Sequence, residues 1–241
     1  RLGDDRRLAD MGPDDIASLV AGVVDELAPE LQNEILLSSA RYRYIVRVLR
    51  GILATATGAL SEHARRSEFR PAGHEVVFGG SGQMPGLELK VSTADSGTRR
   101  VTLAGRIDRV DVAKSGSNSY VRVIDYKSSG RRLEFPDVYY GLTLQLLVYL
   151  AVVLRHSQEL IGSKAEPAGA LYFPMVDPII SAPGPLDDSA LEKRRKRKLR
   201  MSGIVIGDAD IVKLMDRDAE GLSDLVPAGI TSSGKVSKAA G

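Results

Sequence analysis

The stretch 105-GRIDRVDVAKSGSNSYVRVIDYKSSGRRLEF-135 contains two runs rich in β-branched residues, separated by a Gly/Ser/Asn turn. This pattern predicts a β-hairpin. Asp108 lies on the first arm, and the second arm ends in Asp125, Tyr126 and Lys127. Because side chains alternate along a strand, Asp125 and Lys127 face one side of the hairpin and Tyr126 faces the other.

Acidic side chains on adjacent strands repel each other unless a cation neutralises them. Hard divalent cations such as Mg²⁺ bind carboxylate oxygens and keep several waters for a phosphate substrate. We therefore expect Asp108 and Asp125 to bind Mg²⁺, or Mn²⁺ as an alternative, with the main-chain carbonyl of Tyr126 as a further ligand. The ammonium group of Lys127 stabilises negative charge in such a site, so the arrangement suits phosphodiester hydrolysis.

A salt bridge between Asp and Lys across the hairpin is the alternative to a metal site. Such a cross-strand pair contributes about 0.2–1 kcal/mol to stability. The spacing of these residues alone leaves both interpretations open.

The composition is that of an ordinary globular protein. The chain has 241 residues, of which 43% are hydrophobic and 27% charged, and its formal net charge is +2. That charge permits a nucleic-acid partner but does not argue for one. The absence of cysteine excludes disulfides, zinc–thiolate sites and iron–sulfur ligation by this chain.

The longest apolar run is the 14-residue segment GLTLQLLVYLAVVL, which begins at Gly141. A run of this length, interrupted by Gln145, is too short to span a membrane, so we expect no membrane association. The chain begins with Arg1 instead of Met. We take it to be a fragment of a longer protein.

The chain is expected to have three parts. A helical segment covers 1–68, an α/β core covers 69–182, and 183–241 holds a basic helix and a C-terminal extension. Within the core, four strands are expected before a helix at 138–155, and a fifth strand follows it at 168–176. The four strand segments are HEVVF, LELKV, RRVTLAGRIDRV and YVRVIDYK.

Three motifs together resemble a known family: GRIDRVD at 105–111, VIDYKSS at 123–129 and YYGLTLQLLVYL at 139–150. They are similar to the RecB-type branch of the PD-(D/E)XK nucleases, and within it to the AddB (RexB) subunits of bacterial AddAB helicase–nucleases. Further similar segments lie at 69–80, 168–179, 203–216 and 226–230. The resemblance extends from about Ser38 to the end of the chain.

The resemblance implies an α/β fold of the restriction-endonuclease type, a mixed central sheet flanked by helices, with a helical segment at its N-terminus. It implies that Asp108 and Asp125 are metal ligands and that Lys127 is the catalytic lysine. Gln145 matches the family's downstream helix motif, which lines the active site. Tyr149 lies one helical turn later on the same face, where a site role and core packing are both open.

Two further positions have open interpretations. Glu75 opens the first core strand, where it is either a site carboxylate or a solvated strand end. For Tyr139 and Tyr140, packing against the sheet is favoured over stacking on bases. Gln145 interrupts an apolar stripe, where a buried amide needs partners, and this favours a site role.

Basic residues are concentrated in KRRKRKLR at 193–200, in which seven of eight residues are Lys or Arg. Runs of this kind are usually solvated surface, but beside a phosphodiesterase site this one is a candidate DNA-backbone contact. A face for the partner subunit is a further alternative. The candidate DNA-binding residues are Lys193, Arg194, Arg195, Lys196, Arg197 and Lys198. Arginines 41, 43, 47 and 50 on an earlier helix are interpreted as solvated surface.

The function implied by the resemblance is that of a Mg²⁺-dependent DNA exonuclease domain in the bacterial cytoplasm. It hydrolyses one strand at DNA ends during double-strand-break processing and recombinational repair, in a heterodimer with an AddA-type helicase–nuclease subunit. The family also has an upstream histidine and an iron–sulfur cluster held by cysteines. Residues 1–60 lack that histidine motif and the chain lacks cysteine, so the cluster is expected only in the full-length subunit.

Two alternatives differ from this interpretation. One is a non-catalytic DNA-binding or scaffold module that retains the nuclease fold. The other is a stand-alone RecB-like or CRISPR-associated exonuclease, against which the AddB-like segments after Ala168 argue.

Overall fold

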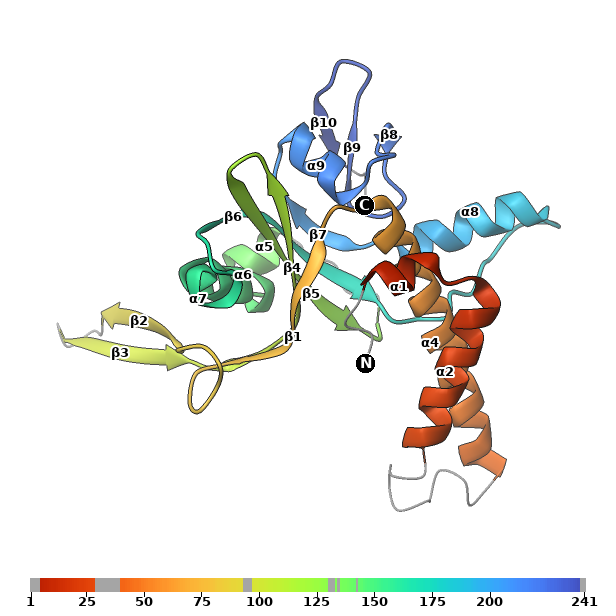
Figure 1. Cartoon of the computed structure of the whole chain (residues 1–241), viewed down its shortest axis with the longest axis horizontal. Helices are drawn as coiled ribbons and strands as arrows, with labels where there is room; N and C mark the ends of the chain where they lie inside the picture. Colours follow the sequence, from red (N-terminus) through yellow and green to blue (C-terminus); the bar gives the residue numbers. More distant parts are fainter. Residues whose placement is uncertain are drawn as a thin grey trace. The chain divides into compact units, whose positions relative to one another are not determined.

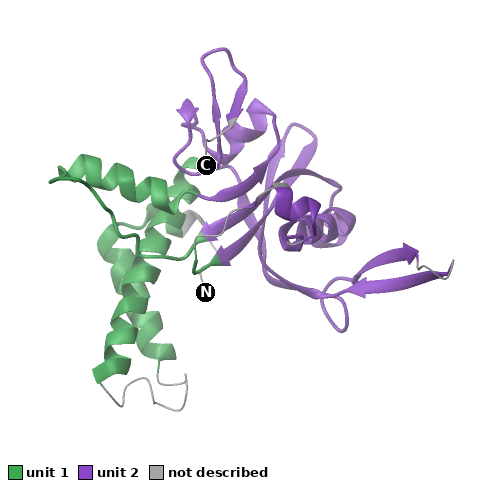
Figure 2. Ribbon diagram, turned by 180° about the vertical axis from the view of Figure 1, so that it is seen from behind, with its two compact units in different colours: residues 1–66, 127–130, 174–200 green, residues 67–126, 131–173, 201–241 purple. Residues whose placement is uncertain are grey.

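The computed structural model describes residues 5–28, 40–92, 97–129, 133, 135–141 and 143–238. These residues form two compact units that are interleaved along the sequence (Figures 1 and 2). Unit 1 comprises residues 1–66, 127–130 and 174–200, and unit 2 comprises residues 67–126, 131–173 and 201–241. The predicted boundaries of three parts remain a prediction.

Unit 1 is helical, as expected for the N-terminal segment. Its helices are α1 (Asp5–Asp10), α2 (Pro13–Leu27), α4 (Ala40–Arg66) and α8 (Asp188–Leu199). Helix α2 begins with Pro13 and two acidic residues in its first turn, which favour a helix start. The second half of the predicted helix 13–39 lies outside the described residues.

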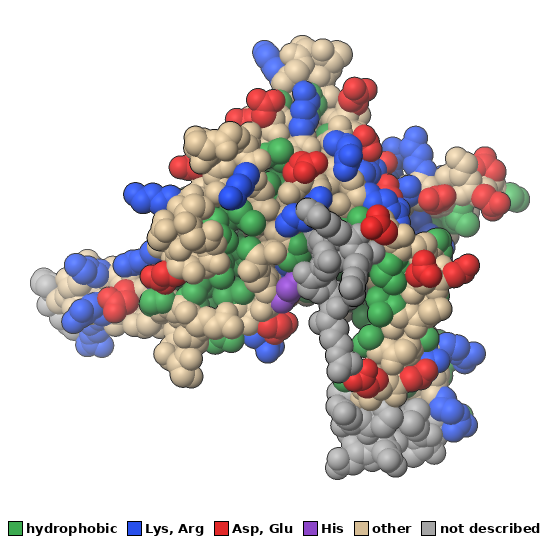
Figure 3. All heavy atoms as spheres, viewed as in Figure 1, with side chains coloured by type: hydrophobic (Ala, Val, Ile, Leu, Met, Phe, Trp, Pro, Cys, Tyr) green, Lys and Arg blue, Asp and Glu red, His purple; other side chains and the backbone are tan. Residues whose placement is uncertain are grey.

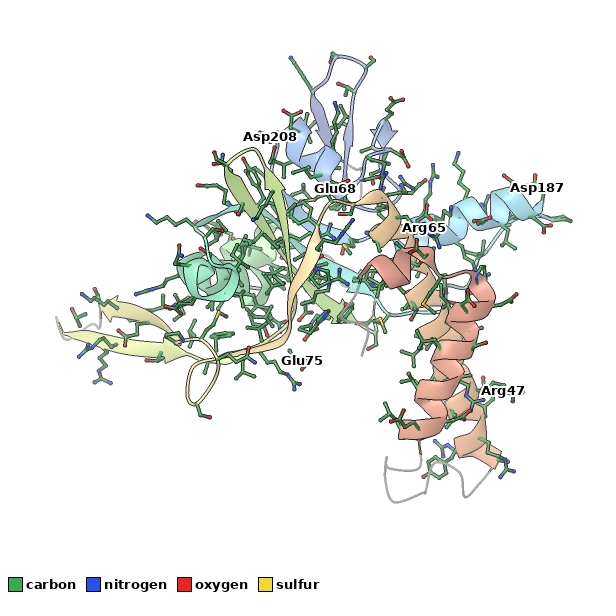
Figure 4. The ribbon with its side chains drawn as sticks, viewed as in Figure 1. Arg47, Arg65, Glu68, Glu75, Asp187 and Asp208 are labelled. Atoms are coloured by element: carbon green, nitrogen blue, oxygen red, sulfur yellow. The ribbon has the colours of Figure 1, made fainter. Side chains whose placement is uncertain are left out.

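Helix α4 holds α1 through side chains on its C-terminal half. Ser61 Oγ donates to the carbonyl of Leu8 at 2.9 Å, and Arg65 Nε donates to the carbonyl of Ala9 at 2.7 Å (Figure 4). These bonds occupy carbonyls in the last turn of α1, which lack partners within the helix.

Unit 2 is built on a five-stranded sheet with the order β1-β4-β5-β6-β7. Its strands are β1 (Arg70–Phe78), β4 (Gly105–Ser115), β5 (Asn118–Lys127), β6 (Ala165–Pro174) and β7 (Ser202–Val205). The pairs β1/β4, β4/β5 and β6/β7 are antiparallel. Gly116, at φ 59°, provides the left-handed residue of the turn between β4 and β5. The predicted hairpin is therefore confirmed.

The segment RRVTLAGRIDRV forms two strands, so the prediction of a single strand is wrong. Strand β3 (Thr98–Leu103) pairs with β2 (Leu87–Ser92) in a separate ribbon, and β4 starts at Gly105 (Figure 1). Ala104 lies between the two strands, close to Gly79, which has φ 78°. A Cβ on Gly79 would lie 2.5 Å from the Cβ of Ala104, so the crossing requires glycine there.

The helix predicted at 138–155 is also interrupted. It forms α5 (Phe135–Tyr139) and α6 (Gln145–Arg155), and α7 (Ser157–Ile161) follows. Gly141 at φ 74° ends α5, and its N–H donates to the carbonyl of Val138 at 3.0 Å. The break places Gln145 at the start of a helix and not within one.

The core of unit 2 lies between α6 and the sheet. Four residues of α6 are buried against it: Leu146, Tyr149, Val152 and Val153. They pack with buried residues of β1, β4, β5 and β6 such as Phe78, Val110, Val123 and Ala170. The continuously buried segments of the central strands and the buried stripe of α6 thus meet in one apolar cluster.

The C-terminal part of unit 2 contains α9 (Ala209–Met215) and a small sheet of the order β10-β9-β8. The strands are β8 (Gly221–Leu222), β9 (Ala228–Ile230) and β10 (Val236–Lys238). Asp208 caps α9 by accepting from the N–H of Asp210 at 2.9 Å. Within the described parts of the chain, no helix has the length and apolarity to cross a membrane.

A buried ion cluster holds β4 to β5. Asp111 is fully buried and accepts from Arg109 Nε at 2.5 Å and from Arg122 Nη2 at 2.8 Å. Asp111 and Arg122 are direct partners in the strand register. Burial raises the pKa of Asp111, but the two guanidinium groups outweigh it and the net pKa is lowered from 3.8.

We predict that Asp111→Asn destabilises the fold by about 3–5 kcal/mol, because it leaves two buried guanidinium groups without their carboxylate. The folded-state pKa lies below the unfolded value, so the stabilisation is present above about pH 4 and is lost as pH falls through the folded pKa. Urea unfolding of wild type and Asp111→Asn across acidic pH measures both effects. A variant within about 1 kcal/mol of wild type at pH 7 would contradict the assignment.

Candidate active site

Asp108 is tied to the neighbouring strand at the point where the predicted site lies. The register of β4 and β5 runs to Arg109 opposite Ile124, and Asp108 and Asp125 are the next residues on the two strands. Asp108 is half-buried, and its Oδ2 accepts a hydrogen bond from the main-chain N–H of Tyr126 at 2.8 Å. A carboxylate accepts several bonds, so this contact orients Asp108 and leaves capacity for a cation.

Asp125 is buried, with 2% of its surface exposed, at the end of the buried segment 121–125 of β5. Burying a carboxylate is costly unless hydrogen bonds or a cation compensate it. The metal-site interpretation of Asp125 and the alternative of an Asp–Lys salt bridge both remain predictions.

The side chain of Tyr126 packs against β6. Its ring packs edge-on against Phe173, with centroids 5.8 Å apart. Burial is the main cause that raises the pKa of the Tyr126 hydroxyl, while Arg109 opposes the shift through charge and a hydrogen bond. The main-chain carbonyl of Tyr126 as a metal ligand remains a prediction.

Lys127 is the last residue of β5 and is counted with unit 1. Its carbonyl accepts from the N–H of Met175 at 2.7 Å. The strand remains regular through Lys127, so local geometry keeps it on the face of Asp125. Its catalytic role remains a prediction.

Gln145 is exposed at the first position of α6, so the expectation of a buried amide is wrong. Its Nε2 donates to Tyr149 Oη at 2.8 Å. Tyr149 is 9% exposed, and its ring packs edge-on against Phe78 with centroids 5.9 Å apart. Tyr149 thus combines core packing with orientation of Gln145.

Glu75 lies on the exposed surface of β1 and forms an ion pair with Arg106 at 2.8 Å (Figure 4). Among the described residues it is the one non-glycine residue with positive φ, at 51°. Such a conformation costs on the order of 1–3 kcal/mol. The surface ion pair accounts for its carboxylate, and a role in the site remains a prediction.

Tyr139 and Tyr140 do not pack against the sheet, so that prediction is wrong. Their side chains are 85% and 73% exposed. Tyr139 is the last residue of α5 and Tyr140 lies in the turn after it, and the partly buried residue at this point is Val138. The motif contained the pair, but the sequence did not show that α5 would end there.

The basic residues of α8 carry both exposed charge and local contacts. Arg194 donates to the carbonyl of Ser181, Arg195 lies 3.8 Å from Asp177, and Lys196 lies 3.4 Å from Glu192. Figure 3 shows acidic and basic side chains together on this helix. On α4, Arg50 pairs with Asp25 and Arg47 lies 5.6 Å from the ring centre of Tyr44, which is the solvated surface expected there.

The carboxylates available for a metal are few. Over the part of the chain that the structure describes, no group of three or more Asp, Glu or His side chains could hold a metal ion. Two carboxylates and a main-chain carbonyl, completed by water or phosphate oxygens, are a donor set that Mg²⁺ accepts. Asp108, Asp125 and Tyr126 therefore fit this ion.

The sequence of residues 5–227 matches the family model of the PD-(D/E)XK nuclease superfamily. The chain belongs to this superfamily. The match covers most of the chain and includes both arms of the central hairpin, α6 and α8. The mixed α/β sheet with flanking helices agrees with the superfamily fold, so the predicted fold class is confirmed.

The chain is also similar to AddB-type proteins, which are named as subunits of an ATP-dependent helicase/deoxyribonuclease. It is 45% identical to the protein of Moorella thermoacetica over 97% of this chain and 20% of the relative. It is 44% identical to the protein of Bacillus licheniformis over 91% of this chain and 18% of the relative. The chain thus spans about a fifth of these relatives, and the resemblance to AddB-type nuclease domains is confirmed.

Substitutions at Tyr149 separate its two contacts. Tyr149→Phe removes the hydroxyl that binds Gln145 and is expected to cost about 0.5–1.5 kcal/mol of stability. Tyr149→Ala also empties the space against Phe78 and is expected to cost about 3–5 kcal/mol. Urea unfolding of both variants provides the comparison. Equal losses would show that the ring does not contribute to the core.

Proposed function

We propose that this nuclease domain hydrolyses phosphodiester bonds of one DNA strand, with Mg²⁺ as its cofactor. The observation that carries the proposal is the pairing of β4 and β5, because half-buried Asp108 and buried Asp125 are the residues directly beyond its last pair, Arg109 and Ile124, and Lys127 follows Asp125 by two residues. Membership of the PD-(D/E)XK nuclease superfamily supports the same chemistry.

The residues of the site have distinct tasks. Asp108 and Asp125 would hold the metal, with the carbonyl of Tyr126 as a third protein ligand. When bound, Mg²⁺ polarises the phosphate and lowers the pKa of a bound water. The N–H of Tyr126 fixes Asp108 in place, and the Lys127 ammonium stabilises the negative charge that develops on the phosphate. Gln145 is positioned by Tyr149 for contact with the substrate.

The biological setting follows from the relatives, whose printed name combines helicase and deoxyribonuclease activities. We propose that the domain acts at DNA ends, together with an AddA-type helicase–nuclease subunit, during repair of double-strand breaks by recombination. DNA as substrate places this activity in the bacterial cytoplasm. An iron–sulfur cluster is proposed only for the full-length subunit, because this chain has no cysteine.

Cleavage of end-labelled linear DNA tests the site. We expect Asp108→Ala, Asp125→Ala and Lys127→Ala in the full-length subunit, assembled with its helicase partner, to lower Mg²⁺-dependent cleavage of one strand by at least about 100-fold. Binding to DNA ends should remain within a few fold, since these residues act on the reacting phosphate.

Lys114→Ala is the matched control, because Lys114 is an exposed lysine on the same hairpin. It should cut like wild type. If Asp125→Ala and Lys127→Ala also cut like wild type, the catalytic proposal is wrong, and the domain is a DNA-binding scaffold that keeps the nuclease fold.

The basic residues of α8 are proposed to contact the DNA backbone. Replacing Lys193, Arg197 and Lys198 with Ala should weaken binding to all sequences alike. Each lost phosphate contact should reduce the slope of log K against log salt by about 0.7–0.9. Lys164→Ala, an exposed lysine outside α8, is the control. An unchanged slope in the triple variant would exclude this role.

A further inference from the structure

Two adjacent tyrosines form an exposed aromatic pair on unit 2. The rings of Tyr139 and Tyr140 lie 5.2 Å apart at an interplanar angle of 85°. Their exposed fractions of 85% and 73% contrast with Tyr172 and Phe173, which are 2% and 0% exposed. Leaving two large rings in water forgoes the stabilisation that burial of apolar surface provides.

The exposure is built into the local backbone. The N–H of Tyr140 donates to the carbonyl of Pro136 at 2.9 Å, and the N–H of Gly141 donates to that of Val138 at 3.0 Å. Gly141 has φ 74°, which a residue with a side chain rarely adopts. These contacts direct the chain inward at Val138 and hold both tyrosines on the outside.

The pair precedes Gln145 by five and six residues, and exposed Leu144 comes directly before Gln145. Gln145 bonds to Tyr149, and a Cβ on Gly105 would lie 3.7 Å from the Tyr149 ring. Gly105 precedes Asp108 by three residues on β4. The aromatic pair, Gln145 and Asp108 thus all belong to unit 2.

The chemistry of the pair favours unpaired bases. Every base has a π-face that stacks on an aromatic ring without regard to sequence. In a duplex these faces are covered by neighbouring base pairs, whereas an unpaired strand exposes them. A domain that cleaves one strand needs to hold that strand apart from its complement, and exposed rings on the unit that carries Asp108 and Asp125 provide such a hold.

We propose that Tyr139 and Tyr140 form a stacking platform for an unpaired base of the strand that is cleaved. The inference rests on the proposed DNA nuclease function. Because the rings are nearly perpendicular, only one ring face can lie parallel to a given base. The platform therefore holds one base, and the second ring supports the first from its edge.

The first experiment measures binding of fluorescein-labelled oligo-dT and of a blunt duplex to the full-length protein in EDTA, which prevents cleavage. We expect Tyr139→Ala/Tyr140→Ala to bind oligo-dT about 10-fold more weakly and the duplex unchanged. The slope against salt should stay the same, since no charge is removed. Both side chains are exposed, so the unfolding midpoint should not change.

Two double variants are the matched controls: Tyr139→Phe/Tyr140→Phe and Tyr139→Leu/Tyr140→Leu. Phe keeps the π-face and should restore oligo-dT binding, whereas Leu keeps apolar surface without a π-face and should not. Equal binding by the Leu and Phe variants would overturn stacking. Oligo-dT binding by the Ala variant at the wild-type level would overturn the platform, as would an equal loss on oligo-dT and duplex.

A second measurement locates the base. Single abasic substitutions along the oligonucleotide should weaken wild-type binding at one position and have no effect there in the Ala variant. If the Ala variant instead fails to assemble with a partner subunit while its oligo-dT binding is unchanged, the surface is a protein contact and the proposal is wrong.

These outcomes are separable from failure of the proposed nuclease function. If the Tyr139→Ala/Tyr140→Ala variant loses oligo-dT binding while Asp125→Ala cuts like wild type, the platform is supported and the catalytic site is rejected. If Asp125→Ala loses cleavage while the Tyr139→Ala/Tyr140→Ala variant binds oligo-dT normally, the catalytic site is supported and the platform is rejected.

Discussion

The antiparallel pairing of β4 with β5 is the constraint on which the site depends. Side chains on a strand alternate, so a shift of one residue would turn Asp108 or Asp125 to the opposite face. The register is held on one side of the site by the bond from the N–H of Tyr126 to Asp108. Further along the hairpin it is held by Asp111, which faces Arg122 across the strands and also binds Arg109. A buried charge cluster with these directional bonds specifies one register more strongly than apolar contacts alone.

The two faces of this hairpin have different tasks. One face carries the apolar residues that pack on α6, such as Val110 and Val123, and Asp108 and Asp125 lie beyond the last β4/β5 pair. The other face carries the Asp111 cluster and the ring of Tyr126 against Phe173. Tyr126 connects this packing to the site, because its N–H holds the carboxylate of Asp108. Packing on both faces of the hairpin holds Asp108 and Asp125 on regular strands, and not on loops that would have to order on binding.

The hairpin and its acidic residues could be predicted from sequence because alternation, β-branched residues and a turn all favoured the same structure. Where the prediction was wrong, a tertiary contact or a single backbone angle decided the outcome. Ala104 fits the pattern of a strand, and only the close approach of Gly79 shows that β3 and β4 separate there. The apolar stripe after Tyr139 fits the pattern of one helix, and the positive φ of Gly141 breaks it. That break exposes Gln145 and the two tyrosines, none of which periodicity could have placed. The ion cluster around Asp111 was missed because its three charged residues look like the solvated face of a strand.

The central claim is that Asp108 and Asp125 share one divalent cation. Electron paramagnetic resonance of Mn²⁺ titrated into the protein measures this directly, without requiring cleavage. We expect one bound Mn²⁺ per chain, lost in both Asp108→Asn and Asp125→Asn and retained in the Glu88→Gln variant, whose carboxylate is exposed on β2. Retention of the bound ion in one or both of the aspartate variants would contradict a shared site at the end of the β4–β5 hairpin.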